Sequence, residues 1–202
     1  IIYPGVKVRA WGYRGYKGHA NEYAITIEPS DTFDPATIQV ENIHVIICLD
    51  TSYSMNNYVT NVYKSRLDIC RLATIDSLNF LNKVAESSKT HIYISLITFS
   101  QEANTIIEYE KLNKLSYDKI IKLVENIEVE SNTNMGVGLK ECIRIQKEHK
   151  CDREIKILLS DGYINEGLSS FEIQEEYGSY FNTTIGIDSV TRYDQKLLSI
   201  LT

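Results

Sequence analysis

The fold is decided by residues 43–54, which read IHVIICLDTSYS. The first seven of these residues form a nearly unbroken apolar run that ends at Asp50. A run of this kind is typical of a strand that is buried on both faces of a parallel sheet. A carboxylate and several hydroxyl groups follow the run at once. The stretch therefore predicts a central strand with a polar loop at its carboxyl end.

Outward from this stretch, strands and helices alternate along the chain. Apolar runs predict strands at 92–99, 155–159 and 181–187, and a shorter strand at 104–108 that pairs antiparallel at an edge. Helical spacing of apolar residues predicts helices at 64–85, 116–126, 135–148, 170–177 and 194–201. This alternation predicts an α/β fold with a doubly wound, mostly parallel, Rossmann-like sheet.

Residues 1–42 have a different pattern and are predicted to be an N-terminal β segment. Val6–Trp11 alternates as a strand does, glycines punctuate 12–18, and Glu22–Ile27 reads as a second strand. We therefore expect a β-hairpin appendage at 1–42 and the α/β domain at 43–202. The whole chain of 202 residues suits one such domain with a small addition.

Composition narrows the classes of function. The net charge of −6 disfavours a general nucleic-acid surface, which needs clustered positive charge. Aromatic and basic residues do mix between Arg9 and Tyr23, which would suit RNA stacking, but cross-strand aromatic pairs in a hairpin explain them more simply. No apolar run approaches the roughly 18 residues that a membrane span needs. We expect neither a nucleic-acid partner nor a membrane span.

The four cysteines show neither CxxC spacing nor a zinc pattern. Cys48, Cys70 and Cys142 fall in apolar stretches and are predicted to be small core residues. This usage favours a reducing, intracellular (cytoplasmic) location over an extracellular one, which stays open as the alternative.

A set of oxygen-bearing side chains follows or precedes the predicted elements at one edge of the sheet. They are Asp50, Ser52 and Ser54 after the first strand, Thr133 before the helix at 135–148, and Asp161 after the strand at 155–159. In open α/β sheets this carboxyl edge binds ligands at the point where strand order reverses. Carboxylates and hydroxyls without thiol or imidazole suit Mg²⁺, Mn²⁺ or Ca²⁺. The sequence therefore predicts a divalent-metal site.

These segments resemble a known family. DTSYS at 50–54 matches the DxSxS motif of von Willebrand factor A domains, whose site is called the metal-ion-dependent adhesion site. NTNMGVGL at 132–139 looks like the family's threonine-bearing loop and following helix, and LLSDG at 158–162 looks like its TDG segment. Order and spacing match, and the resemblance covers residues 43–202.

The resemblance implies a role for each residue. Ser52, Ser54 and Thr133 would ligate the metal directly, and Asp50 and Asp161 would act largely through ordered waters. An open coordination position would then attract an acidic side chain of a partner protein. Magnesium is the expected ion, with Mn²⁺ or Ca²⁺ as alternatives, and the oligomeric state is left open.

Two features depart from the family pattern. Tyr53 stands where the family commonly has glycine, so we expect a reshaped rim with the metal-bearing positions intact. The sequence given stops at Thr202, where the family usually continues to one more strand and helix, so we expect a truncated or abbreviated sheet.

Enzymatic readings fit less well. Phosphatases of the haloacid dehalogenase type need a second aspartate two residues after the first, where this chain has Ser52, and no GxGxxG follows the first strand. We expect a metal-dependent protein-binding module and no enzyme. The alternatives are a substrate-recruiting domain of a larger enzyme, such as a ubiquitin ligase, and a cell-surface adhesin.

Overall fold

A computed structural model describes residues 6–13, 22–29, 41–59, 63–88, 90–187 and 195–202. Its centre is a five-stranded sheet in the order β7-β6-β3-β8-β9. The strands are β3 (Asn42–Asp50), β6 (His91–Phe99), β7 (Ala103–Lys111), β8 (Arg153–Ser160) and β9 (Thr183–Gly186). Only β7 among them runs antiparallel, at one edge beside β6.

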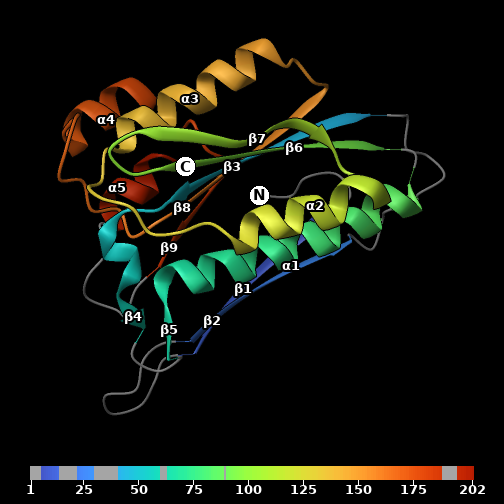
Figure 1. The fold of residues 1–202 in the computed structure, drawn as a ribbon, viewed down its shortest axis with the longest axis horizontal. Coiled ribbons are helices and arrows are strands. Elements are labelled where there is room, and N and C mark those ends of the chain that lie inside the picture. Colours follow the sequence, from blue (N-terminus) through green and yellow to red (C-terminus); the bar gives the residue numbers. More distant parts are fainter. Residues whose placement is uncertain (1–5, 14–21, 30–40, 60–62, 89, 188–194) are drawn as a thin grey trace.

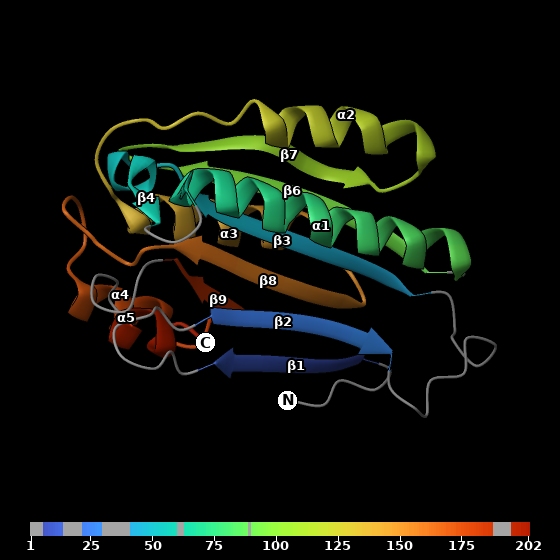
Figure 2. The ribbon, with the colours of Figure 1, turned by 90° about the horizontal axis from the view of Figure 1, so that it is seen from below.

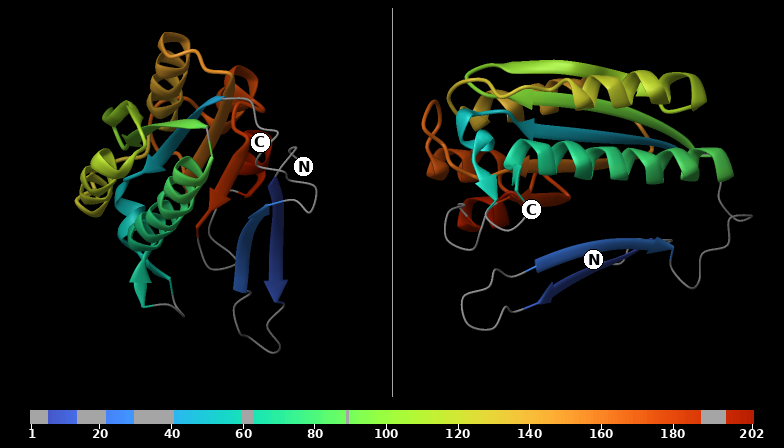
Figure 3. Two further views of the ribbon diagram at one scale, coloured as in Figure 1. Left: turned by 90° about the vertical axis from the view of Figure 1, so that its right-hand side faces the viewer. Right: turned by 60° about the horizontal axis from the view of Figure 1, so that its bottom comes forward.

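Helices cover both faces of this sheet (Figures 1 and 2). They are α1 (Arg66–Ser87), α2 (Lys114–Glu125), α3 (Met135–Glu148), α4 (Ser170–Tyr177) and α5 (Gln195–Ile200). Helices α1 and α2 pack on one face, and α3, α4 and α5 pack on the other. The end-on view in Figure 3 shows the sheet between these two layers.

Strand β3 contributes to both cores, which explains its apolar run. Val45, Ile47 and Leu49 pack in the core beneath α1 and α2, whereas Ile46 and Cys48 pack in the core beneath α3. Successive side chains of a strand point to opposite faces, so a strand between two helical layers needs apolar residues at every position. The predicted α/β class and doubly wound, mostly parallel sheet are confirmed.

The order of the strands places a switch point at the carboxyl end of β3. From β3 the chain crosses through α1 to β6 on one side, and it later returns through α3 to β8 on the other side. The carboxyl ends of β3 and β8 therefore border the crevice in which open α/β sheets bind ligands. Asp50 ends β3, and Asp161 follows β8 directly.

Most predicted elements occur within a few residues of their expected bounds. The helices expected at 135–148 and 170–177 are α3 and α4 with those bounds, and β1 (Val6–Tyr13) pairs antiparallel with β2 (Glu22–Pro29) as a separate hairpin. The glycines at 15 and 18 lie outside the described residues. The strand expected at 181–187 was too long, because residues 183–186 alone pair with β8.

The start of the first helix was also predicted two residues too early. Lys64–Ser65 is strand β5, which pairs antiparallel with β4 (Tyr58–Val59). Helix α1 starts at Arg66 because Ser65 caps it: Ser65 Oγ accepts the backbone N–H of Asp68 at 3.1 Å and donates to Asp68 Oδ2 at 2.7 Å. None of the helices in the described part of the chain is long and apolar enough to span a membrane.

Candidate metal centre

The loop after β3 turns two hydroxyls toward one point. Asp50 Oδ1 accepts the backbone N–H of Ser52 at 2.8 Å, which folds the chain back over the strand end. A short 3₁₀ helix, Tyr53–Asn56, follows. Ser52 Oγ and Ser54 Oγ then lie 3.1 Å apart, with Asp50 and Ser52 buried and Ser54 half-buried.

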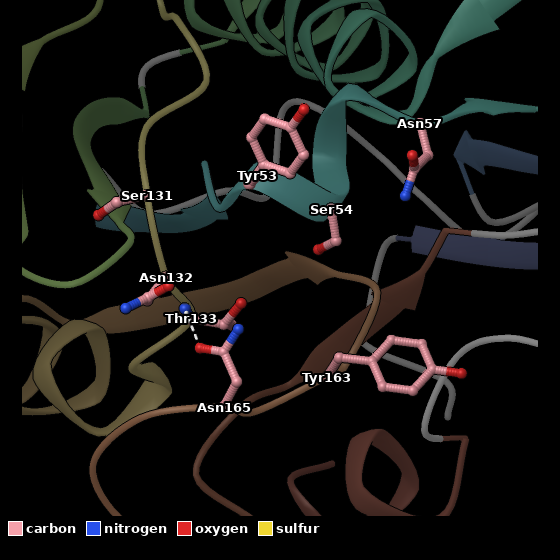
Figure 4. Close-up of a pocket in the computed structure, with 8 residues that line it drawn as sticks. All are labelled: Tyr53, Ser54, Asn57, Ser131, Asn132, Thr133, Tyr163 and Asn165. Atoms are coloured by element: carbon pink, nitrogen blue, oxygen red, sulfur yellow. Dashed lines mark hydrogen bonds between the residues drawn. The ribbon is translucent and has the colours of Figure 1, made fainter.

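The loop before α3 brings Thr133 to the same hollow. The backbone N–H of Tyr53 donates to the carbonyl of Ser131 at 2.7 Å, which ties the two loops together. Thr133 is buried, and its backbone N–H donates to Asn165 Oδ1 at 2.7 Å. Figure 4 shows the Ser54 and Thr133 side chains facing the hollow from opposite sides.

The turn after β8 supplies the second carboxylate. Ser160 Oγ donates to Asp50 Oδ2 at 2.6 Å and accepts the backbone N–H of Gly162 at 2.9 Å, so the ends of β3 and β8 are joined directly. Gly162 has a φ of 79°, a conformation that glycine adopts without the penalty of a side chain. Asp161 between them is fully buried and accepts the backbone N–H of Tyr163 at 3.1 Å.

Arg66 is a charged residue of this region that the sequence analysis did not select. Its Nη1 lies 2.5 Å from Asp161 Oδ2 and also donates to the backbone carbonyl of Ser54 at 3.1 Å. Arg66 is 5% exposed. One signal could have found it: a cation at the first position of a helix faces the positive end of the helix dipole, so this arginine needs a nearby anion.

The two buried carboxylates, Asp50 and Asp161, lie close enough for each charge to affect the other, and burial shifts the pKa of Asp50. Burial is the main cause that raises the pKa of Asp50 to about 6, and the charge of Asp161 raises it further. Hydrogen bonds from Ser160 and Ser52 act in the opposite direction and favour the ionised form. Burial and the neighbouring carboxylate therefore disfavour the ionised form of Asp50, and the two serines offset part of this effect.

A cavity of about 500 Å³ lies between these loops; of the predicted site residues, Ser54 and Thr133 line it, whereas Asp50, Ser52 and Asp161 do not. Uncharged side chains line it: Tyr53, Ser54, Asn57, Ser131, Asn132, Thr133, Tyr163 and Asn165. Tyr53 is 71% exposed and belongs to the rim, as expected from the sequence. Its φ is not positive, so the backbone of this loop does not require a glycine at this position.

The geometry thus defines an α/β domain with an oxygen-rich pocket at the switch point of its sheet. The family model of the von Willebrand factor type A domain matches residues 45–163, which is more than half of the chain. The chain therefore belongs to the von Willebrand factor type A family, whose domains are protein-interaction and adhesion modules. None of the curated proteins matches the sequence.

Solved structures share this fold. A von Willebrand factor type A protein from Catenulispora acidiphila has a TM-score of 0.61 at 18% identity, with 98% of this chain and 43% of that chain covered. The conserved hypothetical protein BatB from Bacteroides thetaiotaomicron has a TM-score of 0.59 at 16% identity, with 79% of this chain and 84% of the BatB chain covered. The minor pilin PilB from Streptococcus sanguinis has a TM-score of 0.54 at 18% identity, with 78% of this chain and 46% of the pilin chain covered. This chain thus spans about half the length of PilB, and at these identities the likeness concerns the fold alone.

Proposed function

We propose that this domain binds a partner protein through a divalent cation, with Mg²⁺ as the expected ion and Mn²⁺ or Ca²⁺ as alternatives. Ser52, Ser54 and Thr133 would hold the ion directly, and Asp50 and Asp161 would hold it largely through waters. The bound cation would supply a Lewis-acidic position for an acidic side chain of the partner. The observation that carries the proposal is the pair of hydroxyls 3.1 Å apart beside two fully buried carboxylates.

The donor set fits a hard cation. Its oxygens come from two carboxylates and three hydroxyls, and neither a thiol nor an imidazole lines the cavity. Thr133 is only 2% exposed as a whole residue and lines the cavity. The site therefore offers oxygen donors of the kind that a hard cation prefers.

The rim supports a protein as the partner. Four exposed tyrosines lie on the cavity wall or on the adjoining β4–β5 hairpin: Tyr53, Tyr58, Tyr63 and Tyr163. Their side chains are 71%, 72%, 87% and 45% exposed. Tyrosine is enriched at protein interfaces, because a rigid ring covers much area at a small entropic cost. A central cation with an aromatic surround would give both orientation and contact area.

Cation binding can be tested directly with Mn²⁺, followed by electron paramagnetic resonance of the free ion. The wild type should bind Mn²⁺ and release it to excess Mg²⁺. Asp50→Asn and Ser54→Ala should each weaken binding on the order of tenfold or more, because each removes a donor or its charge. Ser77→Ala is the matched control, since Ser77 Oγ bonds only the carbonyl of Ala73 within α1. Binding that is equal in all four proteins would refute the site.

The proposed role is binding without catalysis, in an intracellular setting. Cys48, Cys70, Cys142 and Cys151 are free thiols, which supports a reducing compartment. Adhesion at a cell surface is the second candidate, and the shared fold of the pilin PilB supports it. Capture of a partner from matched cytoplasmic and surface fractions, with and without a chelator, separates the two settings.

A further inference from the structure

Two asparagine side chains on the wall of the cavity have fixed orientations. Asn165 Oδ1 accepts the backbone N–H of Thr133 at 2.7 Å. Asn132 Nδ2 donates to Glu166 Oε2 at 3.2 Å. Because an amide has one acceptor oxygen and one donor nitrogen, these bonds leave Asn165 Nδ2 as a donor and Asn132 Oδ1 as an acceptor for a ligand. Figure 4 shows both side chains beside Thr133, and both line the cavity.

The loops that carry these two amides are tied to each other. The carbonyl of Thr133 accepts the backbone N–H groups of Asn165 and Glu166, each at 3.2 Å. Gly167 follows with a φ of 78°, and a Cβ at this position would overlap the side chain of Asn134. The loop before α3 and the loop after β8 therefore lie in close contact. The two amides are held in place before a ligand binds, which lowers the entropic cost of binding.

A neighbouring donor and acceptor of this kind match the peptide group of another chain. Every main-chain N–H and C=O needs a hydrogen-bond partner, and an amide side chain can supply either one. A helix uses these groups in its own hydrogen bonds, so an extended segment presents them to another protein. The described residues that line the cavity are uncharged, so a neutral main chain meets no unpaired charge there.

We propose that Asn132 and Asn165 bind the main-chain amide next to the partner's acidic side chain, so that the domain selects an acidic residue in an extended segment over one in a helix. Asn132 Oδ1 accepts the N–H of the segment, and Asn165 Nδ2 donates to its C=O. Ser54 and Thr133 line the same cavity, so the carboxylate and the main chain of one residue would share one site. This inference rests on the proposed cation site and adds the partner's backbone to it.

Three small probes test the inference in Mn²⁺ titrations of the wild type at constant ionic strength. They are propionate, which is a carboxylate alone, N-acetyl-aspartate N-methylamide, which adds a main-chain amide on each side, and the analogue of the latter with both amide nitrogens methylated. Each probe should tighten Mn²⁺ binding through linkage. The blocked aspartate should do so at a concentration on the order of tenfold lower than propionate, because it adds two hydrogen bonds. The methylated analogue should lose part of this gain, because it has no amide N–H.

Asn132→Ala removes the acceptor and provides the second arm. It should bind Mn²⁺ and propionate as the wild type does, but it should no longer distinguish the blocked aspartate from its methylated analogue. Asn126→Ala is the matched control, since Asn126 Nδ2 donates to the carbonyl of Lys122 at 2.7 Å at the end of α2.

Equal potency of propionate and the blocked aspartate on the wild type would overturn the inference, even if Asn132→Ala does not fold. An effect of methylation that is equally large in Asn132→Ala and the wild type would also overturn it. Failure of the wild type to bind Mn²⁺ would instead refute the proposed function itself.

Discussion

His44 gives the protein an acid sensitivity that can be worked out from its surroundings. It is fully buried near the start of β3, with Nε2 at 2.8 Å from Ser95 Oγ and the ring edge-on to Tyr109 at 4.9 Å. Ser95 Oγ accepts the backbone N–H of Tyr109, so its single proton is available to a neutral imidazole. Burial first, and then the neighbouring His149, lowers the pKa of His44 from 6.5 to about 4.

The sign and size of the effect follow from this pKa. Because the unfolded chain binds a proton at His44 more readily than the folded chain does, the stability from this residue is complete above pH 6.5. It is lost as the pH falls toward 4. At about 1.4 kcal/mol per pH unit once the unfolded residue is protonated, the loss between pH 7 and pH 5 is about 2 kcal/mol.

The assay is urea unfolding of the wild type and His44→Gln at pH 7 and pH 5. Glutamine does not titrate, so the variant should lose about 2 kcal/mol less than the wild type over this interval, or about 1 M in midpoint. The pKa of Asp50, about 6, changes stability in the opposite direction over the same interval, and the comparison with the variant cancels its effect. Parallel pH dependence in the two proteins would refute the argument.

Two further predictions concern the elements that position the site. Gly138→Ala should cost about 1–2 kcal/mol of stability despite alanine's better helix propensity, because an added Cβ would lie 2.8–2.9 Å from buried atoms of Phe99. Thermal unfolding measures it, and a variant as stable as the wild type contradicts the close packing of α3 on β6. Ser65→Ala should cost about 1 kcal/mol by removing the cap of α1. Chemical denaturation measures this loss, and an unchanged midpoint would mean that the cap contributes nothing.

The fold was predictable from sequence wherever one local pattern dominates. The run at 43–49 fixes a doubly buried strand, and the apolar spacing at 135–148 predicts α3 within its observed bounds. The β4–β5 hairpin was not predictable, because strands of two residues have no periodicity. The end of β9 depends on pairing with β8, which the sequence of β9 alone does not encode.

Some residues of the candidate site could also be predicted from the sequence, and others could not. Asp50, Ser52 and Ser54 are neighbours in sequence, so their convergence could be expected from one motif. The contact between Arg66 and Asp161 joins residues 95 positions apart, and helical periodicity carries no information about it. Only the folded chain shows that a cation already faces the second carboxylate. Whether the five predicted residues bind a metal stays a prediction until Mn²⁺ is titrated.

The buried carboxylates and the exposed rim tyrosines belong to different parts of the structure, so the tyrosines can be substituted without changing the carboxylates. The buried carboxylates stand at the ends of two paired strands: Asp50 ends β3 and accepts a hydrogen bond from Ser160 Oγ, and Asp161 follows β8 directly. The tyrosine side chains are exposed and belong to neither hydrophobic core, apart from partial burial of Tyr163. If the domain binds its partner as proposed, exchange of Tyr53, Tyr58 or Tyr163 would change the target that it contacts and leave the proposed cation site unchanged. A small panel of rim variants would serve equally well as a starting library for engineered binders.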